Sequence, residues 1–238
     1  MATPEAAIAN TPDELIAIVA HELRYPLVPM RRAAALLLHD TVDAATLHRV
    51  AEIVERQVST MNRLIGDLVD AARMQQGVVE LRRERAALAD LLECAAESAA
   101  PLIHERGHTF TVSAPAETVY LNMDVLRLTQ ALLNIIANAT KYTDRHGEIV
   151  MSACREGDHA VIIVSDTGIG IPPHDLEAIF GLFAKSSQEL RIEPGLGIGL
   201  FLARHLVEAH GGTVTASSAG SGRGSEFTVR LPCEAAIG

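Results

Sequence analysis

Apolar residues recur at the spacing of an α-helix in two long stretches near the start of the chain. On a wheel of about 100° per residue, residues 15–38 and 43–75 each gather their apolar positions into one stripe. The stripe of the first stretch consists of Leu15, Val19, Leu23, Leu27, Met30, Ala34 and Leu37. The polar stretch 39–43 between them predicts a short turn, so the pattern indicates an antiparallel helical hairpin. One hairpin buries too little alone, which favours a dimeric four-helix bundle.

The pattern changes after residue 86, where helical and alternating stretches follow one another. We predict helices at 87–105, 123–142 and 197–210, and strands at 108–113, 119–122, 147–154, 159–166, 212–218 and 225–231. Such a mixture is typical of a helical layer packed on a mixed sheet. We therefore divide the chain into residues 1–10 (disordered or linker), 11–76 (hairpin), 77–86 (linker), 87–232 (second domain) and 233–238 (tail).

Charge and composition narrow the classes of partner. The 238 residues carry a formal net charge of −10, with 3% aromatic residues and no tryptophan, which argues against binding nucleic acid or an anionic membrane. An anionic small molecule remains compatible, because helix N-termini and a metal ion can neutralise it locally. Three scattered cysteines, no signal peptide and no long apolar run lead us to expect a cytoplasmic location and no membrane contact by this chain.

The stretch "IVAHELRYPL", 18–27, places a histidine and a proline inside the first predicted helix. His21 lies near the centre of the polar side of the wheel, with Glu22 at its flank, so we expect the imidazole to face water. Pro26 has no N–H to donate to the carbonyl of Glu22, which predicts a bend beside His21. The bend is either a hinge between two states or a proline tolerated because bundle packing compensates for it.

A polar line runs along the helix predicted at 123–142. Asn134, Asn138 and Lys141 stand at i, i+4 and i+7 and therefore share one face. Asparagine oxygens suit Mg²⁺, and a lysine suits phosphate. Taken alone, this spacing is more typical of a solvated polar face.

Two glycine-containing stretches follow, "DTGIG" at 166–170 and "GLGIG" at 195–199. In the first, an apolar strand ends at an aspartate that can accept a hydrogen bond from an exocyclic amine such as that of adenine. In the second, glycines lead into a helix N-terminus, where a phosphate can bind. The roughly 25 residues between them show little periodicity and predict a functional loop, such as a lid. Each stretch alone is also compatible with an ordinary turn.

Five segments together resemble the H, N, G1, F and G2 boxes of bacterial sensor histidine kinases, in their order and spacing. The segments are residues 18–27, 134–142, 166–171, 180–183 and 195–200. The resemblance extends over about residues 11–232. It implies a dimerisation and histidine-phosphotransfer hairpin, and an ATP-binding α/β two-layer sandwich of the type (Bergerat) that gyrase and Hsp90 share.

The resemblance also implies roles for residues of the hairpin. His21 would be the phosphoacceptor, and Glu22 would hydrogen-bond the far ring nitrogen and act as base. Tyr25 occupies the position four residues after His21, where the family usually has a threonine or asparagine that supports dephosphorylation of the partner. We therefore expect weak phosphatase activity.

In the second domain the resemblance implies an ATP and Mg²⁺ site. Asn138 would ligate Mg²⁺ with Asn134 in support, Lys141 would contact phosphate, and Tyr142 would border the nucleotide. The remaining implied nucleotide-site residues are Asp166 at the adenine amine, Gly168 and Gly170 beside it, Phe183 (with Phe180) anchoring the lid, and Gly195, Gly197, Gly199 and Leu200 on the phosphate side.

The leading functional hypothesis is a protein-histidine kinase, homodimeric through residues 11–76. It would phosphorylate His21 from ATP and pass the phosphoryl group to an aspartate in the receiver domain of a response regulator. The alternative is a non-catalytic dimeric scaffold that binds nucleotide or regulator. A third possibility, a mechanical ATPase clamp like gyrase or Hsp90, is disfavoured by the exposed pair His21 and Glu22 on a hairpin.

Overall fold

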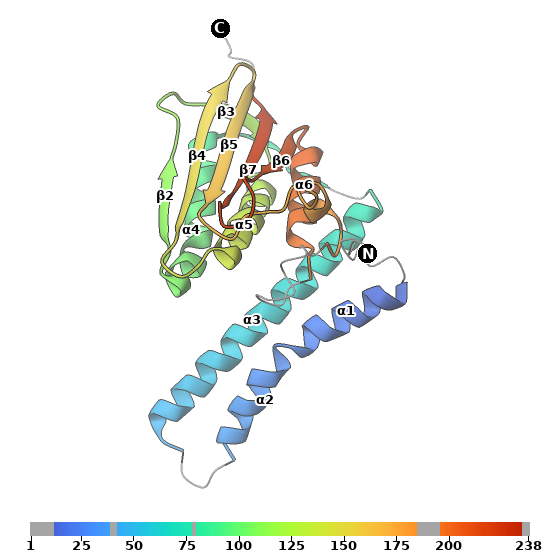
Figure 1. Ribbon diagram of the computed structural model, residues 1–238, viewed down its shortest axis with the longest axis vertical. Helices are drawn as coiled ribbons and strands as arrows, with labels where there is room; N and C mark the ends of the chain where they lie inside the picture. The colour runs from blue at the N-terminus through green and yellow to red at the C-terminus, as the bar shows by residue number, and fades with distance from the viewer. Residues whose placement is uncertain (1–11, 39–41, 78–79, 185–195, 235–238) are drawn as a thin grey trace.

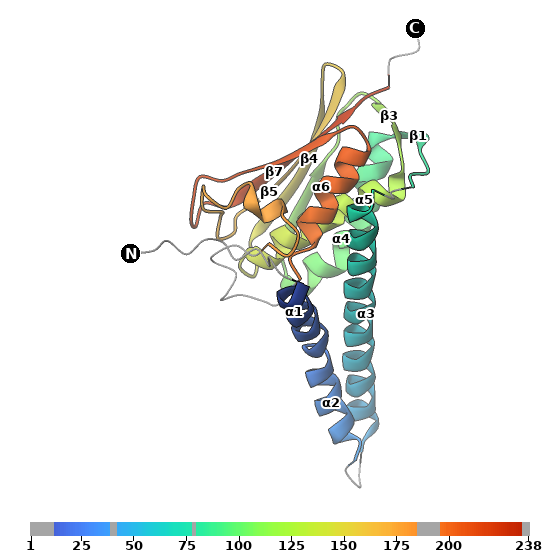
Figure 2. The ribbon, with the colours of Figure 1, turned by 90° about the vertical axis from the view of Figure 1, so that its right-hand side faces the viewer.

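The computed structural model describes residues 12–38, 42–77, 80–184 and 196–234, which form a helical hairpin below an α/β sandwich (Figure 1). The hairpin consists of α1 (Pro12–Arg24), α2 (Leu27–Leu36) and α3 (Ala44–Gln75). α1 and α2 follow one another along one side, and α3 runs antiparallel to them (Figure 2). The predicted hairpin is therefore present, but its first arm is two helices rather than one.

The break in the first arm lies at Pro26. The N–H of Tyr25 donates to the carbonyl of His21 at 3.2 Å, as in an α-helix, whereas the N–H of Val28 donates to the carbonyl of Tyr25, only three residues back, at 3.2 Å. Pro26, with φ −66°, has no N–H with which to continue the helix. The helix expected to be disturbed beside His21 is interrupted between Arg24 and Leu27, whereas the hinge between two states stays a prediction.

α3 begins at a capping aspartate and ends inside the sandwich. The carboxylate of Asp43 accepts a hydrogen bond from the N–H of Thr46 at 2.8 Å, which satisfies a free donor of the first turn. At the other end, Ala71 and Met74 are buried in the same hydrophobic core as the sandwich helices. Towards the turn, apolar side chains of both arms stay exposed at Leu27, Leu36, Leu37, Leu47 and Val58.

The sandwich places three helices on one face of a five-stranded sheet (Figure 2). The strand order is β2-β4-β5-β7-β6, and only the β2–β4 pair is parallel among these neighbours. The strands are β2 (Thr109–Ser113), β4 (Glu148–Glu156), β5 (His159–Asp166), β6 (Thr213–Ser217) and β7 (Ser225–Pro232). The helices are α4 (Leu88–Arg106), α5 (Val125–Tyr142) and α6 (Gly199–Ala209), with a short 3-10 turn, η1 (Ala178–Phe180), beside them. The predicted two-layer fold is confirmed.

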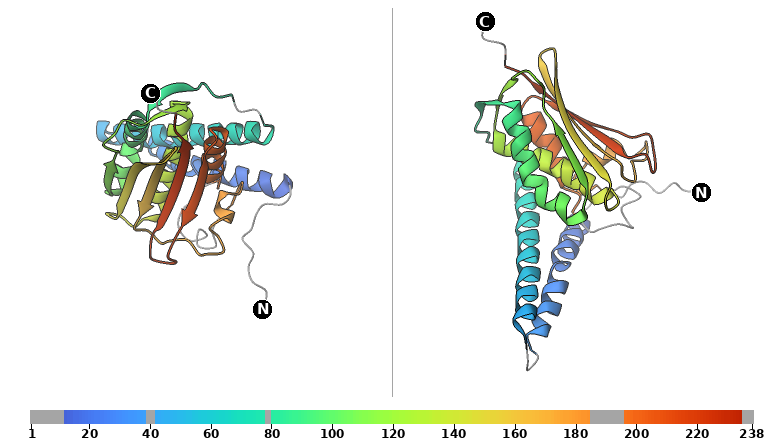
Figure 3. Two further views of the ribbon diagram at one scale, coloured as in Figure 1. Left: turned by 90° about the horizontal axis from the view of Figure 1, so that it is seen from above. Right: turned by 90° about the vertical axis from the view of Figure 1, so that its left-hand side faces the viewer.

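A second, two-stranded sheet lies in part of the segment that we predicted as linker. β1 (Glu84–Ala87) pairs antiparallel with β3 (Tyr120–Met123). The guanidinium of Arg85 lies 3.5 Å from the ring centre of Tyr120, and its Nε donates to Glu234 at 2.9 Å. The linker prediction for 77–86 is therefore wrong from residue 84 onward, where the chain is fixed to the sandwich (Figure 3).

The core lies between the sheet and its helices. Leu132 and Ile135 of α5, Ile162 of β5 and Phe227 of β7 belong to this one buried cluster, and all four are fully buried. Burial of this kind contributes roughly 1.5–3 kcal/mol for each large side chain. In the described ranges, none of the helices combines the length and the hydropathy that crossing a membrane requires.

Candidate functional site

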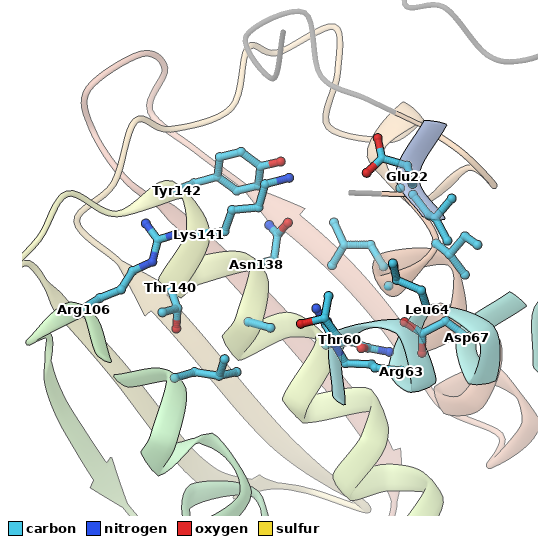
Figure 4. Close-up of a pocket in the computed structure, with 18 of the residues that line it drawn as sticks. Glu22, Thr60, Arg63, Leu64, Asp67, Arg106, Asn138, Thr140, Lys141 and Tyr142 are labelled. Atoms are coloured by element: carbon cyan, nitrogen blue, oxygen red, sulfur yellow. The ribbon is translucent and has the colours of Figure 1, made fainter. Parts of the chain in front are cut away.

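A cleft of about 630 Å³ opens where the hairpin meets the sandwich (Figure 4). Its walls come from the end of α1, from the middle of α3, from the C-terminal parts of α4 and α5, and from the loops after β5 and before α6. The cleft therefore joins residues predicted to bind nucleotide to residues beside the predicted phosphoacceptor.

The polar line predicted on α5 forms one wall of this cleft. Asn134, Asn138, Lys141 and Tyr142 all line it, and the ammonium of Lys141 lies 4.7 Å from the ring centre of Tyr142. The opposite side of the helix is core, at Leu128, Leu132, Ile136 and Ala139. The amide nitrogen of Asn134 is buried and has no hydrogen-bond partner among the described residues. Such an orphaned donor fits a site whose ligand completes its hydrogen bonds.

Asp166 closes another part of the cleft at the end of β5. One carboxylate oxygen accepts from the N–H of Gly168 at 2.8 Å and of Ser225 at 3.3 Å, while the other accepts from the Ser225 hydroxyl. Burial raises the pKa of Asp166 above its usual value, and these hydrogen bonds oppose that change. Sequence reasoning missed Ser225, which faces Asp166 across the antiparallel β5–β7 register.

Glycine is required on both glycine stretches because the backbone packs closely there. A Cβ on Gly170, whose φ is +72°, would lie 2.2 Å from the carbonyl oxygen of Gly220. A Cβ on Gly168 would lie 2.4 Å from the carbonyl oxygen of Tyr142. Gly170 lines the cleft, whereas Gly168 does not. Gly168 instead lets the loop approach the end of α5, where Ile169 donates to the carbonyl of Tyr142 at 3.0 Å.

The residues predicted on the phosphate side and at the lid also differ in whether they line the cleft. Gly197, Gly199 and Leu200 line the cleft, and a Cβ on Gly197 would lie 2.3 Å from the carbonyl oxygen of Ala184. Gly195 lies outside the described residues. Phe183, predicted to anchor the lid beside the nucleotide, is buried in the core and does not itself line the cleft; its role as an anchor stays a prediction. Phe180 is likewise in the core, edge-on to Phe227 with ring centres 6.2 Å apart.

The predicted phosphoacceptor and its neighbour point in different directions. The side chain of His21 is 73% exposed, as expected, and does not line the cleft. Glu22, expected at the flank of the polar side, is instead 5% exposed, and its carboxylate projects into the cleft (Figure 4). The 3.7 Å between His21 Nδ1 and Glu22 Oε1 is too long for a hydrogen bond. The predicted contact between the two side chains is therefore not made in this arrangement.

The hairpin contributes polar residues that sequence reasoning did not select. Thr60, Arg63 and Asp67 stand at i, i+3 and i+7 of α3 and line the cleft. The pKa of Asp67 is raised to about 6, chiefly by burial; the charge of Arg63 opposes this shift, and that of Asp70 adds to it. The sequence holds no signal for these residues, because the polar face of a solvated helix has the same pattern.

The donor set of the cleft fits a magnesium nucleotide. An amide oxygen of Asn138 suits Mg²⁺, Lys141 suits phosphate, and Asn134 has a free donor. Among the residues that the structure describes, no group of three or more His, Cys, Asp or Glu side chains could hold a metal. A magnesium ion here would therefore share its ligands between the protein and the phosphates, as Mg²⁺ often does.

Two family models match the chain. Residues 13–77 match the His Kinase A (phospho-acceptor) domain, and residues 123–235 match the histidine kinase-, DNA gyrase B- and HSP90-like ATPase family. The chain is 32% identical over 237 residues to the sensor protein KdpD of Escherichia coli, covering 99% of this chain and 26% of KdpD. It thus spans about a quarter of that relative.

Solved structures agree with this assignment. Full-length ShkA in complex with AMPPNP is 29% identical, with a TM-score of 0.67 over 96% of this chain and 47% of that one. The histidine kinase ThkA in complex with the response regulator TrrA shares the fold, with 22% identity and a TM-score of 0.65 over 92% of this chain and 61% of that one. With both family models matched in order along one chain, this protein belongs to the sensor histidine kinases and contains the two parts of their catalytic core, the phospho-acceptor hairpin and the ATP-binding domain.

Proposed function

We propose that this chain transfers the γ-phosphoryl group of ATP to His21 and then to an aspartate of a response regulator. The observation that carries the proposal is the single cleft that joins the α5 residues Asn138 and Lys141 to the helix bearing His21. Phosphoryl transfer needs mainly positioning and neutralisation of charge, and the cleft brings together groups suited to both.

In this proposal the α5 wall holds the nucleotide. Asn138 ligates Mg²⁺ with Asn134 in support, Lys141 contacts phosphate, and Tyr142 borders the nucleotide. Asp166 accepts a hydrogen bond from the adenine amine, and Gly168 and Gly170 form the loop that follows it. The phosphate side is formed by Gly197, Gly199 and Leu200. The orphaned amide of Asn134 and the close backbone packing at Gly170 and Gly197 support these roles.

His21 is the proposed nucleophile and Glu22 the proposed base. The high exposure of the imidazole suits a group that must first meet ATP, the phosphoryl donor, and then the aspartate of the regulator, the phosphoryl acceptor. Because the carboxylate of Glu22 lies 3.7 Å from His21 Nδ1, a small change in rotamer would bring the two within hydrogen-bond distance.

The hairpin is also the proposed site of both protein contacts. Exposed apolar residues on its two arms, such as Leu27, Leu37 and Leu47, would be covered in a homodimeric four-helix bundle formed through residues 11–76. A response regulator is the proposed acceptor, since the related ThkA fold forms a complex with one. The proposed location of this chain is the cytoplasm.

The direct test is incubation of the chain with γ-labelled ATP and Mg²⁺, beside His21→Ala. We expect acid-labile, alkali-stable label on the wild-type chain and none on the variant. Nucleotide binding, measured by calorimetry, should be equal in the two. Binding without labelling of either protein would favour the non-catalytic scaffold instead.

A further inference from the structure

A three-residue clasp joins the hairpin to the ATP-binding domain. Nη1 of Arg127 on α5 lies 3.0 Å from Oδ2 of Asp70 on α3 and 3.0 Å from Oε1 of Gln130, one turn along α5. Nε2 of Gln130 donates to the same oxygen of Asp70 at 3.0 Å. Asp70 and Arg127 are 18% and 30% exposed. The three side chains thus bond to one another in a closed, partly buried arrangement.

The clasp sits at a junction of several elements in the first turn of α5. The carboxylate of Asp124 caps this turn by accepting from the N–H of Arg127 at 3.1 Å, and it also accepts from the N–H of Arg82 at 2.9 Å. The N–H of Asp124 in turn donates to Nε2 of His210, just after α6, at 3.0 Å. The hairpin, the segment that follows it and α6 therefore all attach to the same turn.

The far end of α5 carries Asn138 and Lys141, so the clasp sets how the nucleotide site faces the hairpin. In the clasped arrangement, Glu22 lines the cleft while His21 remains outside it. In the same arrangement, Ala71 and Met74 of α3 are buried in the core of the ATP-binding domain. A nucleotide held on α5 would thus meet the neighbour of the phosphoacceptor rather than the phosphoacceptor.

We propose that Asp70, Arg127 and Gln130 are positioning residues whose clasp holds the ATP-binding domain on its own hairpin in a pose that withholds the nucleotide from His21. Phosphoryl transfer then requires the clasp to open. This inference rests on the proposed kinase function. The three residues touch neither the cleft nor the reacting groups, so they act by setting the pose and leave nucleotide contacts intact.

The test compares the 238-residue chain with Asp70→Asn, Arg127→Gln, and the charge exchange Asp70→Arg with Arg127→Asp. Two quantities are measured, hydrogen exchange of residues 64–74 without nucleotide and the initial rate of autophosphorylation at saturating ATP. We expect both single variants to exchange faster and to phosphorylate about fivefold faster, the effect of losing one partly exposed ion pair. The KM for ATP should not change, and the charge exchange should restore both quantities towards wild type.

Glu156→Gln is the matched control, because it removes a carboxylate that pairs with Arg230 at 2.9 Å on strands β4 and β7, away from the cleft. It should leave both quantities unchanged. Unaltered exchange in Asp70→Asn would overturn the clasp, and faster exchange with an equal or lower phosphorylation rate would overturn its inhibitory role. If the wild-type chain and every variant fail to incorporate phosphate, the proposed function fails, and hydrogen exchange alone then decides whether the clasp holds the two domains together.

Discussion

Replacing Asp67 with asparagine should stabilise the protein, although it removes a charged residue from a helix surface. Asp67 lies on α3 in the wall of the cleft, and packing against the ATP-binding domain raises the pKa of its carboxyl from 3.8 to about 6. Above pH 6 the folded chain therefore keeps an ionised carboxylate in a poorly hydrated place. Asparagine has the same shape and no charge, so it removes this cost.

The size and the sign of the effect follow from the shift in pKa. A change from 3.8 to about 6 corresponds to about 3 kcal/mol as an upper limit, and partial hydration of the half-buried group reduces this to between about 1 and 3 kcal/mol. Between pH 4 and 6 the folded state holds a proton that the unfolded state has lost, so the free energy of unfolding from this group falls as pH rises. Above pH 6 its contribution is constant.

The assay is urea denaturation followed by far-ultraviolet circular dichroism for wild type and Asp67→Asn at pH 4, 5, 6 and 7.5. The free energy of unfolding of the variant should exceed that of wild type by about 1–3 kcal/mol at pH 7.5. This difference should vanish towards pH 4. Asp70→Asn, one turn along α3, should have the opposite sign because that carboxylate is paired with Arg127. A variant that is less stable than wild type at pH 7.5, or a difference independent of pH, would refute the reasoning.

Three further predictions concern other parts of the molecule. Burial lowers the pKa of His210, whose Nε2 accepts from the N–H of Asp124, so stability should fall as pH drops below 6.5, and His210→Gln should lessen this fall in urea denaturation. Gly170→Ala should weaken binding of an ATP analogue by about tenfold in calorimetry, whereas Gly157→Ala, with φ +61° and open space around it, should not. Tyr25→Thr, which replaces a 56% exposed ring on the cleft wall, should speed dephosphorylation of a labelled regulator severalfold with nucleotide affinity unchanged.

Elements with strong local signals could be predicted closely from the sequence. β5 was expected at 159–166 and spans His159–Asp166, and α3 was expected at 43–75 and spans Ala44–Gln75. β1 could not be predicted, since its sequence "ERAA" has no alternating pattern. Its pairing with β3 and the contact of Arg85 with Tyr120 are non-local, and only tertiary structure creates them.

The candidate site shows the same division between local and tertiary information. The period of one helix puts Asn138 and Lys141 on one face, and the resemblance to the N box selected them from what would otherwise be an ordinary polar face. Ser225 and Asp67 could not be selected, since the first depends on the register between β5 and β7 and the second on docking of α3. The inward turn of Glu22 depends on the same docking, which is why the wheel of a single helix placed it only at the flank of the polar side.

The length of α5 explains why a clasp so far from the chemistry can control it. Fourteen residues separate Arg127 from Lys141, which is about 21 Å along a helix. A tilt of about 10° at the clasp would therefore displace the phosphate-binding end by about 4 Å. On the hairpin side, consecutive side chains such as His21 and Glu22 differ by about 100° around α1, and the predicted hinge at Pro26, where α1 ends and α2 begins, would let α1 turn independently of α2. Bringing His21 to the cleft in place of Glu22 would thus need a small tilt of α5 at the proposed clasp and a rotation of α1 at the predicted hinge.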